Sequence, residues 1–371
     1  MVYEERRLRT ESTPTGRYDE QADAMFWQSH PYSWPVIGWP SDLEVISKAQ
    51  ADEFFATYYA PNNLTGVLVG NFDPAEVREL ADRYFGRLER GQREAPDVVT
   101  LEAEQLAEKR LTAECDCQPQ LQLRYHAVPF GHADGYALDV IAGVLNGRTG
   151  RLYEEMVEGA EIASSAGAFF DARKYAGVFN LRAETKGDAP PEQLLAAWDE
   201  VVAELIAEPV PEDELAKVKN RVSADTYRQL REPFFLMIQL AVMDSMGDWR
   251  YLNTVAERTN QVTAEDVQRV AAKYLQQSKR LVSLYYRKAG TEAEETPAEL
   301  EALPPEMRTA LMSQAEAIAA IEDPAQLEAV LQQVDAQAGQ VPDEMRPALE
   351  WMRSVIEERL AELREDDGGE E

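Results

Sequence analysis

The chain has 371 residues, of which 44% are apolar and 28% are charged, and its formal net charge at pH 7 is −31. This length and apolar content are sufficient for two or three folded domains. The negative charge argues against nucleic acid and against an anionic membrane surface as partners, because both need clusters of Lys and Arg. No apolar run reaches the roughly 20 residues that a membrane-spanning helix requires.

The beginning of the chain is predicted to form helices that are interrupted by proline. Residues 1–12 are charged and helical, and residues 18–29 form a second helix with apolar side chains at core spacing. Residues 30–47 contain prolines at positions 31, 35 and 40. Because proline disrupts both a regular helix and a central strand, we expect this segment to be irregular.

A helix, a strand and a second helix are predicted next. Ser47 and Gln50 have the spacing of a capping box, which places a helix start at Ser47. The apolar, β-branched stretch 64–72 predicts a buried strand. Asp73 followed by Pro74 indicates the N-cap and first turn of a helix that runs to about residue 85.

The middle of the chain alternates between strand and helix patterns. The acidic, proline-containing stretch around residues 89–99 is typical of a linker. After it, alternating or apolar runs predict strands at 108–114, 120–128, 176–185 and 280–288. Helices are predicted at 133–147, 191–208, 211–246 and 263–275.

Two segments of the chain resemble each other. Residues 46–59 and 262–275 share a β-branched residue, a hydroxyl cap and apolar positions at matching steps, and a strand is predicted after each. This repeat favours two homologous domains in tandem. Because much less chain precedes the first copy than the second, we expect the first domain to be incomplete.

The C-terminal part differs in composition. From Thr291 to the end there are 22 acidic and 5 basic residues, a net charge of −17. Prolines separate short helical patterns, which predicts a helical appendage with a disordered tail from residue 364. The predicted domains are therefore 1–92, a linker at 93–104, 105–289 and an acidic extension at 290–371.

Few residues are candidates for chemistry. The histidines His30, His126 and His132 stand in no H-E-x-x-H or H-x-x-E-H arrangement, so we expect structural roles and keep ligation by His126 and His132 as the alternative. Cys115 and Cys117 alternate along a predicted strand and therefore lie on one face, where bridging is constrained. We expect free thiols, and a metal role is the alternative.

Three stretches carry a resemblance to a known family. "VYEERRLR", "HPYSWPVIG" and "YYAPNNLTGVLVGNFDP", in this order, resemble the pitrilysin/insulinase family of zinc metallopeptidases, in particular its bacterial and mitochondrial-processing-peptidase-like members. The resemblance extends over about residues 1–288. It implies an α+β fold of two tandem homologous domains with mostly antiparallel sheets, of which the first is incomplete at its N-terminal side.

The resemblance also implies where a zinc site would stand. Members of this family bind zinc through H-x-x-E-H on one helix and a Glu on a later helix, and the register places that Glu at Glu5. Without the resemblance, Glu5 is an exposed helix carboxylate. The H-x-x-E-H helix with its general base is absent from this sequence. We therefore expect zinc in the full-length parent, none bound by this chain alone, and no catalytic residue here.

A second family feature is an Arg and a Tyr that hold the substrate backbone. The matching stretch "GRLYEEMVEGAEIASSAGA" retains Arg151 and Tyr153 of the motif but has Val157 and Ser164 at the pair positions. In two-subunit members, the zinc-binding chain lacks this pair and a partner supplies it. The resemblance thus implies a family subunit as partner, and divergence in a non-catalytic homologue is the alternative.

These observations lead to two functional hypotheses. The first is a zinc metalloendopeptidase-family protein that acts on peptides or unfolded proteins and is inactive as this chain alone. The second is a non-catalytic partner subunit that binds peptide or scaffolds a complex. Whether the chain is an enzyme, and whether it works in a bacterial periplasm or cytoplasm, is left open by the residues.

Overall fold

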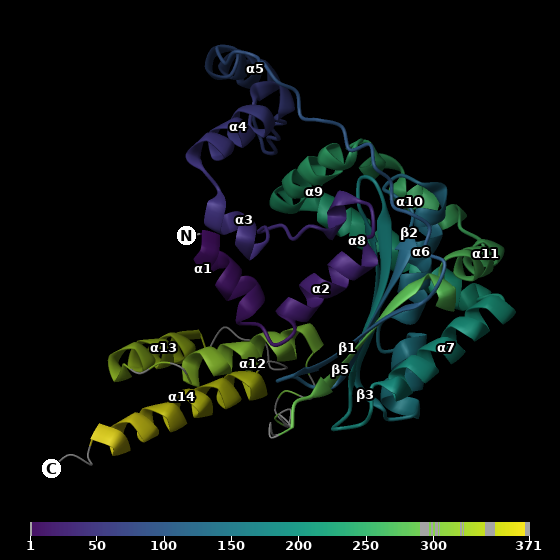
Figure 1. Ribbon diagram of the computed structural model, residues 1–371, viewed down its shortest axis with the longest axis vertical. Helices are drawn as coiled ribbons and strands as arrows, with labels where there is room; N and C mark the ends of the chain where they lie inside the picture. Colours follow the sequence, from purple (N-terminus) through teal and green to yellow (C-terminus); the bar gives the residue numbers. More distant parts are fainter. Residues whose placement is uncertain are drawn as a thin grey trace. The chain divides into compact units, whose positions relative to one another are not determined.

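The chain divides into two compact units. A computed structural model describes residues 2–289, 297, 300, 303, 305–319, 321, 323–337 and 346–367. The first unit is Met1–Glu292 and the second is Ala293–Glu371 (Figure 1). The predicted division of the first unit at residues 93–104 stays a prediction.

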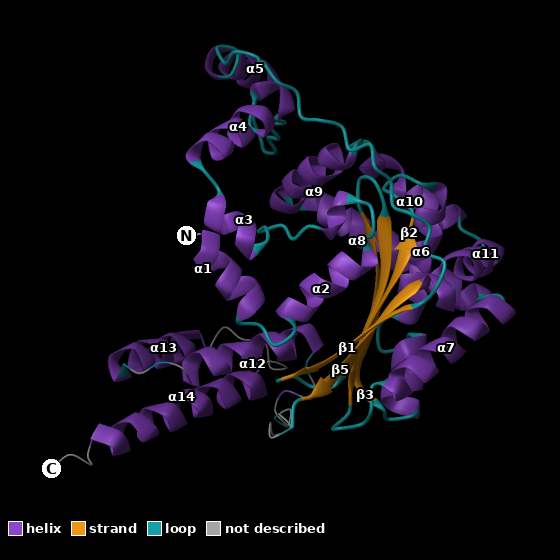
Figure 2. Cartoon of the chain, viewed as in Figure 1, coloured by secondary structure: helices purple, strands orange, loops and turns teal. Residues whose placement is uncertain are grey.

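A mixed five-stranded sheet is the centre of the first unit (Figure 2). Its strands are β1 (Lys109–Cys115), β2 (Gln120–Ala127), β3 (Ala163–Ala172), β4 (Gly177–Thr185) and β5 (Arg280–Arg287). They lie in the order β1-β5-β2-β4-β3, and only β1 and β5 are parallel. The predicted α+β class with a mostly antiparallel sheet is confirmed.

Three helices cover one face of the sheet: α6 (Ala133–Leu145), α7 (Glu192–Ala207) and α11 (Ala264–Tyr274). Alternate residues of the strands, such as Leu121, Leu123 and Val282, are fully buried against them. Trp198 of α7 is also fully buried, and its indole N–H donates to the Tyr125 hydroxyl at 2.7 Å. This layer is the main hydrophobic core.

A buried carboxylate ties α6 to α11. Asp134, in the first turn of α6, accepts hydrogen bonds from Arg269 Nη1 at 2.8 Å, Lys273 Nζ at 2.9 Å and the Tyr274 hydroxyl at 2.7 Å. These donors lower the pKa of Asp134 against the opposing effect of its burial. Because three donors satisfy the charge, the network fixes the angle between the two helices.

Helix α2 (Gly16–Phe26) packs on the opposite face of the sheet. The buried side chains of Phe26 and Trp27 contact a small apolar cluster that includes Leu281 of β5. Polar contacts complete the interface, since Arg124 Nη1 of β2 donates to Asp23 Oδ1 at 2.7 Å. The predicted helix at 18–29 thus exists and is amphipathic in the expected sense.

The other N-terminal helices contribute little to the core. They are α1 (Val2–Arg6), α3 (Pro40–Val45), α4 (Lys48–Tyr58) and α5 (Pro74–Tyr84). A capping box of Ser47 and Gln50 begins α4, and the Asp73 side chain caps α5, as predicted. Neither α4 nor α5 has a buried residue. Among the described residues, no helix is long and apolar enough to cross a membrane.

The predicted buried strand at 64–72 is wrong. The segment is irregular, and Leu64 and Leu68 are 58% and 63% exposed. A strand needs a neighbouring strand for its backbone hydrogen bonds. All five described strands lie between residues 109 and 287, and none of them pairs with 64–72.

The helices between β4 and β5 differ in one place from the prediction. The predicted helix at 211–246 is two helices, α8 (Glu212–Arg231) and α9 (Pro233–Met246), followed by α10 (Tyr251–Gln261). The break falls at Pro233, which lacks the backbone N–H that a continuous helix would use. Strand β3 was not predicted, because its Ala, Ser and Gly residues have a weak strand pattern.

The outer edge of the sheet at β3 is bonded by a side chain. Asn146, directly after α6, donates from Nδ2 to the Ala168 carbonyl at 2.5 Å. Its Oδ1 accepts from the Ala168 N–H at 2.9 Å. The amide therefore makes the two hydrogen bonds that a residue of a neighbouring strand would make.

The two cysteines are not free. Cys115 and Cys117 form a disulfide, so the expectation of free thiols is wrong. Strand β1 ends at Cys115, and the chain turns through Asp116 and no longer alternates as a strand. The turn brings the two Cα atoms to 5.3 Å, which is within the usual range for a disulfide.

The second unit is helical in its described residues. Its helices are α12 (Pro305–Ala319), α13 (Pro324–Gln337) and α14 (Arg346–Asp367), and their core includes Leu327 and Ile356. Helix α14 includes residues 364–367, where the sequence predicted the start of a disordered tail. The remainder of that tail, 368–371, lies outside the described residues.

Candidate functional site

Helix α1 is anchored by a buried arginine. Arg6 is 3% exposed, and its guanidinium donates to both carboxylate oxygens of Glu20 on α2, at 2.6 and 2.8 Å. Arg6 also donates to the Gly38 carbonyl at 2.8 Å. A π-helical turn, Arg7–Glu11, joins α1 to the following bend. The bidentate ion pair therefore fixes α1 relative to α2.

The predicted family residue Glu5 lies next to this anchor on an exposed part of α1. Its side chain is 50% exposed, and its carboxylate lies 3.3 Å from Arg9 Nε. Such an exposed pair is weak and easily exchanged for another partner. The carboxylate thus stands on a fixed helix, and it takes no part in the packing of the core. Its assignment as a zinc ligand stays a prediction.

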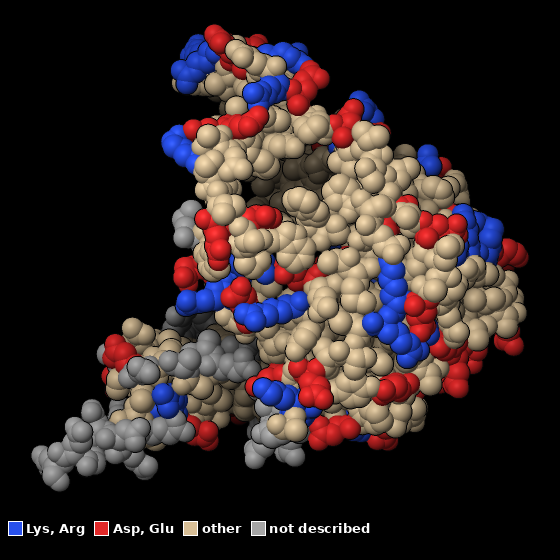
Figure 3. Space-filling model, viewed as in Figure 1, with Lys and Arg blue, Asp and Glu red and all other residues tan. Residues whose placement is uncertain are grey.

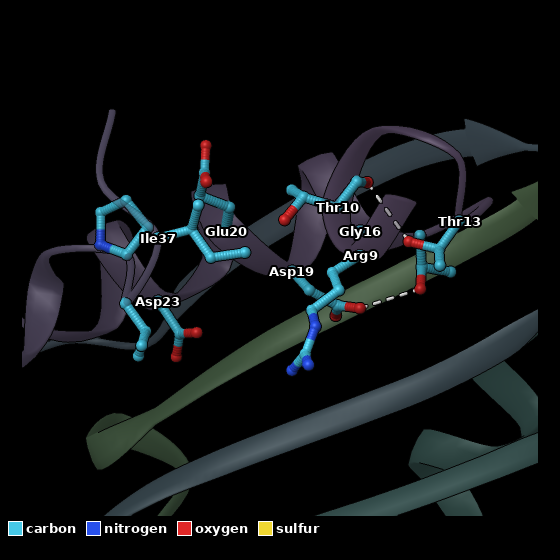
Figure 4. A pocket seen from close by; sticks show the side chains of 11 residues that line it. Arg9, Thr10, Thr13, Gly16, Asp19, Glu20, Asp23 and Ile37 are labelled. Carbon is cyan, nitrogen blue, oxygen red and sulfur yellow. Dashed lines mark hydrogen bonds between the residues drawn. The ribbon is translucent and has the colours of Figure 1, made fainter. Parts of the chain in front are cut away.

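A cavity of about 410 Å³ lies beside α1 and α2 (Figure 4). Its lining comes from residues 9–37 and includes threonine hydroxyls, Arg9 and three carboxylates, those of Asp19, Glu20 and Asp23. The carboxylates are already bonded within the fold. Glu20 pairs with Arg6, Asp23 pairs with a β2 arginine, and Asp19 accepts from the Thr15 and Tyr285 hydroxyls.

This cavity does not fit a catalytic metal centre. A catalytic zinc site needs three protein ligands and an open position. Among the described residues, no group of three or more His, Cys, Asp or Glu side chains could hold a metal ion. The described residues therefore do not fit a zinc ion by themselves, and none of them forms a metal-binding group with Glu5.

Other residue types, Val157 and Ser164, stand at the positions of the family's Arg/Tyr pair. Val157 lies in a π-helical turn, Tyr153–Gly159, where it packs against the main core. Ser164 lies in β3. The retained Arg151 is engaged in structure, because its guanidinium forms a bidentate pair with Glu214 of α8 at 3.0 and 3.2 Å.

The three histidines have separate local roles. His132 caps α6, and its Nδ1 accepts from the Asp134 N–H at 3.0 Å. His30 accepts from the Tyr32 N–H at 3.1 Å. His126 is stacked on Phe26 with ring centroids 3.8 Å apart. Each histidine thus has a local contact in the fold, and His126 and His132, the alternative ligand pair, lie in no group of the described residues that could hold a metal ion.

Arg6 and Glu20, which position Glu5, were not predicted from the sequence. Their separation of 14 residues has no local periodicity, so only the three-dimensional fold reveals the pair. A local signal was present in Gly16. A Cβ atom there would lie 2.1 Å from the Thr10 carbonyl oxygen, so the close turn between α1 and α2 requires glycine.

Apolar side chains are exposed on several helices of the first unit. Figure 3 shows an area of uncharged side chains over α9. Phe54 and Phe55 of α4 are 57% and 62% exposed, and Phe234 and Phe235 of α9 are 63% and 54% exposed. The Thr65 hydroxyl donates to Asp244 of α9 at 2.8 Å. Exposed aromatic side chains are typical of interaction sites where they form a contiguous patch.

Comparison with known proteins identifies relatives of the chain. Residues 46–222 match the family model described as the peptidase M16 inactive domain. The zinc protease PqqE of Helicobacter pylori is 26% identical over 281 residues, which are 74% of this chain and 63% of that protein. An uncharacterized zinc protease of Mycobacterium bovis is 25% identical over 275 residues, covering 73% of this chain and 62% of that protein.

Solved structures show the same fold. A protease from Helicobacter pylori has a TM-score of 0.72 at 24% identity, over 77% of this chain and 70% of that chain. A peptidase M16 inactive domain from Pseudomonas fluorescens has a TM-score of 0.66 at 19% identity, over 77% and 68% of the two chains. This chain spans about 63% of the length of the curated relatives that it matches. Residues 46–222 thus match a peptidase M16 family model, and the related zinc proteases are consistent with the pitrilysin/insulinase family of peptidases.

Proposed function

We propose that this chain is an incomplete, peptide-holding part of a zinc metalloendopeptidase assembly, inactive alone, and that Glu5 contributes one ligand to the zinc of the assembly. It depends on a family polypeptide that carries H-x-x-E-H. The observation that carries the proposal is the contrast between adjacent residues of α1. Arg6 is buried and anchors the helix, whereas Glu5 is exposed and has only a surface ion pair.

Two further features support a role in an assembly. The match to an inactive domain and the names of the related zinc proteases agree with a member of a peptidase family that lacks its own metal site. The exposed aromatic residues of α4 and α9 supply apolar surface for a partner. The substrate we infer is a peptide or an unfolded protein.

The test combines the chain with a family subunit that carries H-x-x-E-H. We expect the chain alone to bind no stoichiometric zinc and to leave a fluorogenic peptide uncleaved. The mixture should cleave the peptide in a chelator-sensitive way. Glu5→Gln should abolish this gain, whereas Glu4→Gln should retain it. Glu4 is the matched control because it stands on the same helix and is 67% exposed.

Two results would overturn the proposal. One is about one tightly bound zinc per chain together with chelator-sensitive hydrolysis by the chain alone. The other is a mixture that hydrolyses peptide equally well with Glu5→Gln and with the unaltered chain. Elemental analysis after gel filtration measures the zinc, and the rate of fluorescence increase measures the hydrolysis.

A further inference from the structure

The two edges of the five-stranded sheet differ in what covers them. At the β3 edge, the Asn146 amide already bonds the backbone of Ala168. Strand β1 is the other edge, and within the described chain it pairs with β5 alone. It has seven residues, contains no proline and keeps one register with β5 over its whole length. A regular strand of this kind with one unpaired side is a template for pairing with another strand.

The backbone of β1 directs every second residue away from β5. Cys115 accepts a backbone N–H from the residue just after β5 at 2.8 Å, so its carbonyl points toward that strand. In a parallel pair the inward and outward residues alternate. Arg110, Thr112 and Glu114 therefore direct both their N–H and their C=O outward. The Tyr18 hydroxyl donates to the Glu114 carbonyl at 2.9 Å, which agrees with this direction and leaves that carbonyl a second lone pair.

The side chains of these outward residues are exposed on the face of the sheet that carries α6, α7 and α11. Arg110 is in register with Val282 of β5 and Thr112 with Leu284, and both β5 residues are buried in the main core. Residues in register on neighbouring strands share a face, yet Arg110, Thr112 and Glu114 are exposed. The helix layer therefore ends at β5 and leaves this face of β1 uncovered. The opposite face of β1 packs against α2.

The charges on this edge are complementary to themselves. Charged side chains on an edge strand usually repel a second strand. When two β1 strands are placed antiparallel and centred on Thr112, however, Arg110 of each copy lies opposite Glu114 of the other. All three residues point outward, so each pair can exchange N–H···O=C bonds in both directions. Opposite charges directly across an antiparallel pair stabilise it, and the two-fold axis forms this ion pair twice.

The net charge of −31 does not exclude such a contact. At about 0.15 M salt the Debye length is about 8 Å, so distant charges of two chains are largely screened, whereas charges in contact are not. Strand β1 itself has two basic residues and one acidic residue. Arg110 has an ion pair with Glu108 at 2.6 Å, but its side chain is 54% exposed, and Glu108 also lies 2.7 Å from the buried Arg280. The Arg110 guanidinium can therefore turn to a new partner without leaving Glu108 unpaired.

We propose that β1 pairs with β1 of a second copy of this chain, antiparallel and centred on Thr112, so that the two sheets join into one continuous sheet. The pairing ends at Cys115, because the chain turns there through the disulfide. The occupant is a second copy rather than an unrelated peptide, because a peptide of arbitrary sequence would use only the backbone groups and leave Arg110 and Glu114 unmatched. This inference does not depend on the function proposed above.

The experiment measures the monomer–dimer equilibrium of the full chain by analytical ultracentrifugation. Concentrations up to about 200 μM at about 0.15 M salt cover the micromolar affinities of small interfaces, and we expect a dimer in this range. Arg110→Glu and Glu114→Arg each place like charges opposite each other twice, so each should raise the dimer Kd about tenfold to a hundredfold. An equimolar mixture of the two variants should recover the dimer, because every cross-strand pair again joins opposite charges. Arg228→Glu is the matched control, since it changes the net charge equally on a side chain of α8 that is 78% exposed.

A backbone variant tests the strand pairing itself. Thr112→Pro removes an outward N–H and leaves the ladder with β5 intact, since proline is tolerated where the N–H of an edge strand faces solvent. It should abolish the dimer, whereas the matched control Thr112→Val keeps the N–H and should retain it.

Hydrogen exchange of the unaltered chain, resolved by residue, protects the test against variants that do not fold. The outward amides of Arg110, Thr112 and Glu114 should exchange fast in dilute solution and slowly in concentrated solution. The inward amide of Ala113 should be protected in both. The proposal is overturned by a chain that stays monomeric, by a dimer that Arg110→Glu and Thr112→Pro leave unchanged, or by a variant mixture that does not recover the dimer.

Discussion

We expect the charged form of Asp139, a residue of α6, to destabilise the folded state. It is half-buried beside the stacked rings of Tyr136 and Tyr251, and burial raises its pKa to about 7. No described basic residue forms an ion pair with it. Above pH 7 the folded state therefore has to hold a desolvated carboxylate.

The sign and size of the effect follow from proton binding. The unfolded carboxyl has a pKa near 3.8, so between that value and about 7 the folded state binds more protons than the unfolded state. The free energy of unfolding then falls as the pH rises through this window. A shift of about three pKa units corresponds to at most ~4 kcal/mol. Asp139→Asn removes the charge and keeps the shape, so it should stabilise the fold by up to ~4 kcal/mol at pH 8 and hardly at pH 4.

Urea unfolding at pH 4, 6 and 8 measures this difference in the free energy of unfolding. Asp134 on the same helix is the control, because its pKa is shifted in the opposite direction. Its pKa is lowered by three donors, so its charge stabilises the fold above pH 4 and this contribution is lost as the pH falls further. Asp134→Asn should cost about 2–3 kcal/mol at pH 8. The reasoning on Asp139 fails if Asp139→Asn destabilises the fold at pH 8, or if it changes stability equally at pH 4 and pH 8.

Three other changes have expected outcomes. Arg6→Ala should cost about 2–3 kcal/mol and speed amide exchange of α1, because it leaves Glu20 unpaired, whereas the 67% exposed Arg7 should be replaceable by Ala without effect. Iodoacetamide should modify Cys115 and Cys117 only after reduction, which mass spectrometry measures. Alkylation of these cysteines in the unreduced chain would contradict the disulfide. Amides of α4 and α5 should exchange faster than those of α6 and α11, since neither α4 nor α5 has a buried residue; equal protection would show that these helices have a packing partner.

Local signals predicted the helix starts well. The capping box predicted at Ser47 is formed, and Thr263, which the repeat predicts as a hydroxyl cap, also forms a capping box. In each case the hydrogen bonds connect residues three positions apart, so the sequence contains all participants. The break at Pro233 had an equally local signal, and treating 211–246 as one helix overlooked it.

The strands and the site residues whose partners are distant in the sequence could not be predicted in the same way. The run 64–72 has the composition of a strand, yet β structure depends on what lies beside it, and no described strand does. Strand β3 shows the reverse case, because weak strand formers are paired along the whole length of β4. In the candidate site, the family resemblance predicts Glu5 as a zinc ligand, and this assignment stays a prediction. The anchor Arg6, which pairs across 14 residues, could only be found in the fold.

The amide of Asn146 has a consequence for how the sheet meets other molecules. An approaching extended chain would align its backbone along β3, but the middle of that edge is already bonded at Ala168. To pair with β3 at Ala168, this chain would first have to displace the Asn146 amide. At that residue it would then form only the two hydrogen bonds that the amide had made. Asn146 thus protects the β3 edge against pairing with a strand of another molecule, which is the step by which exposed sheet edges aggregate into fibrils.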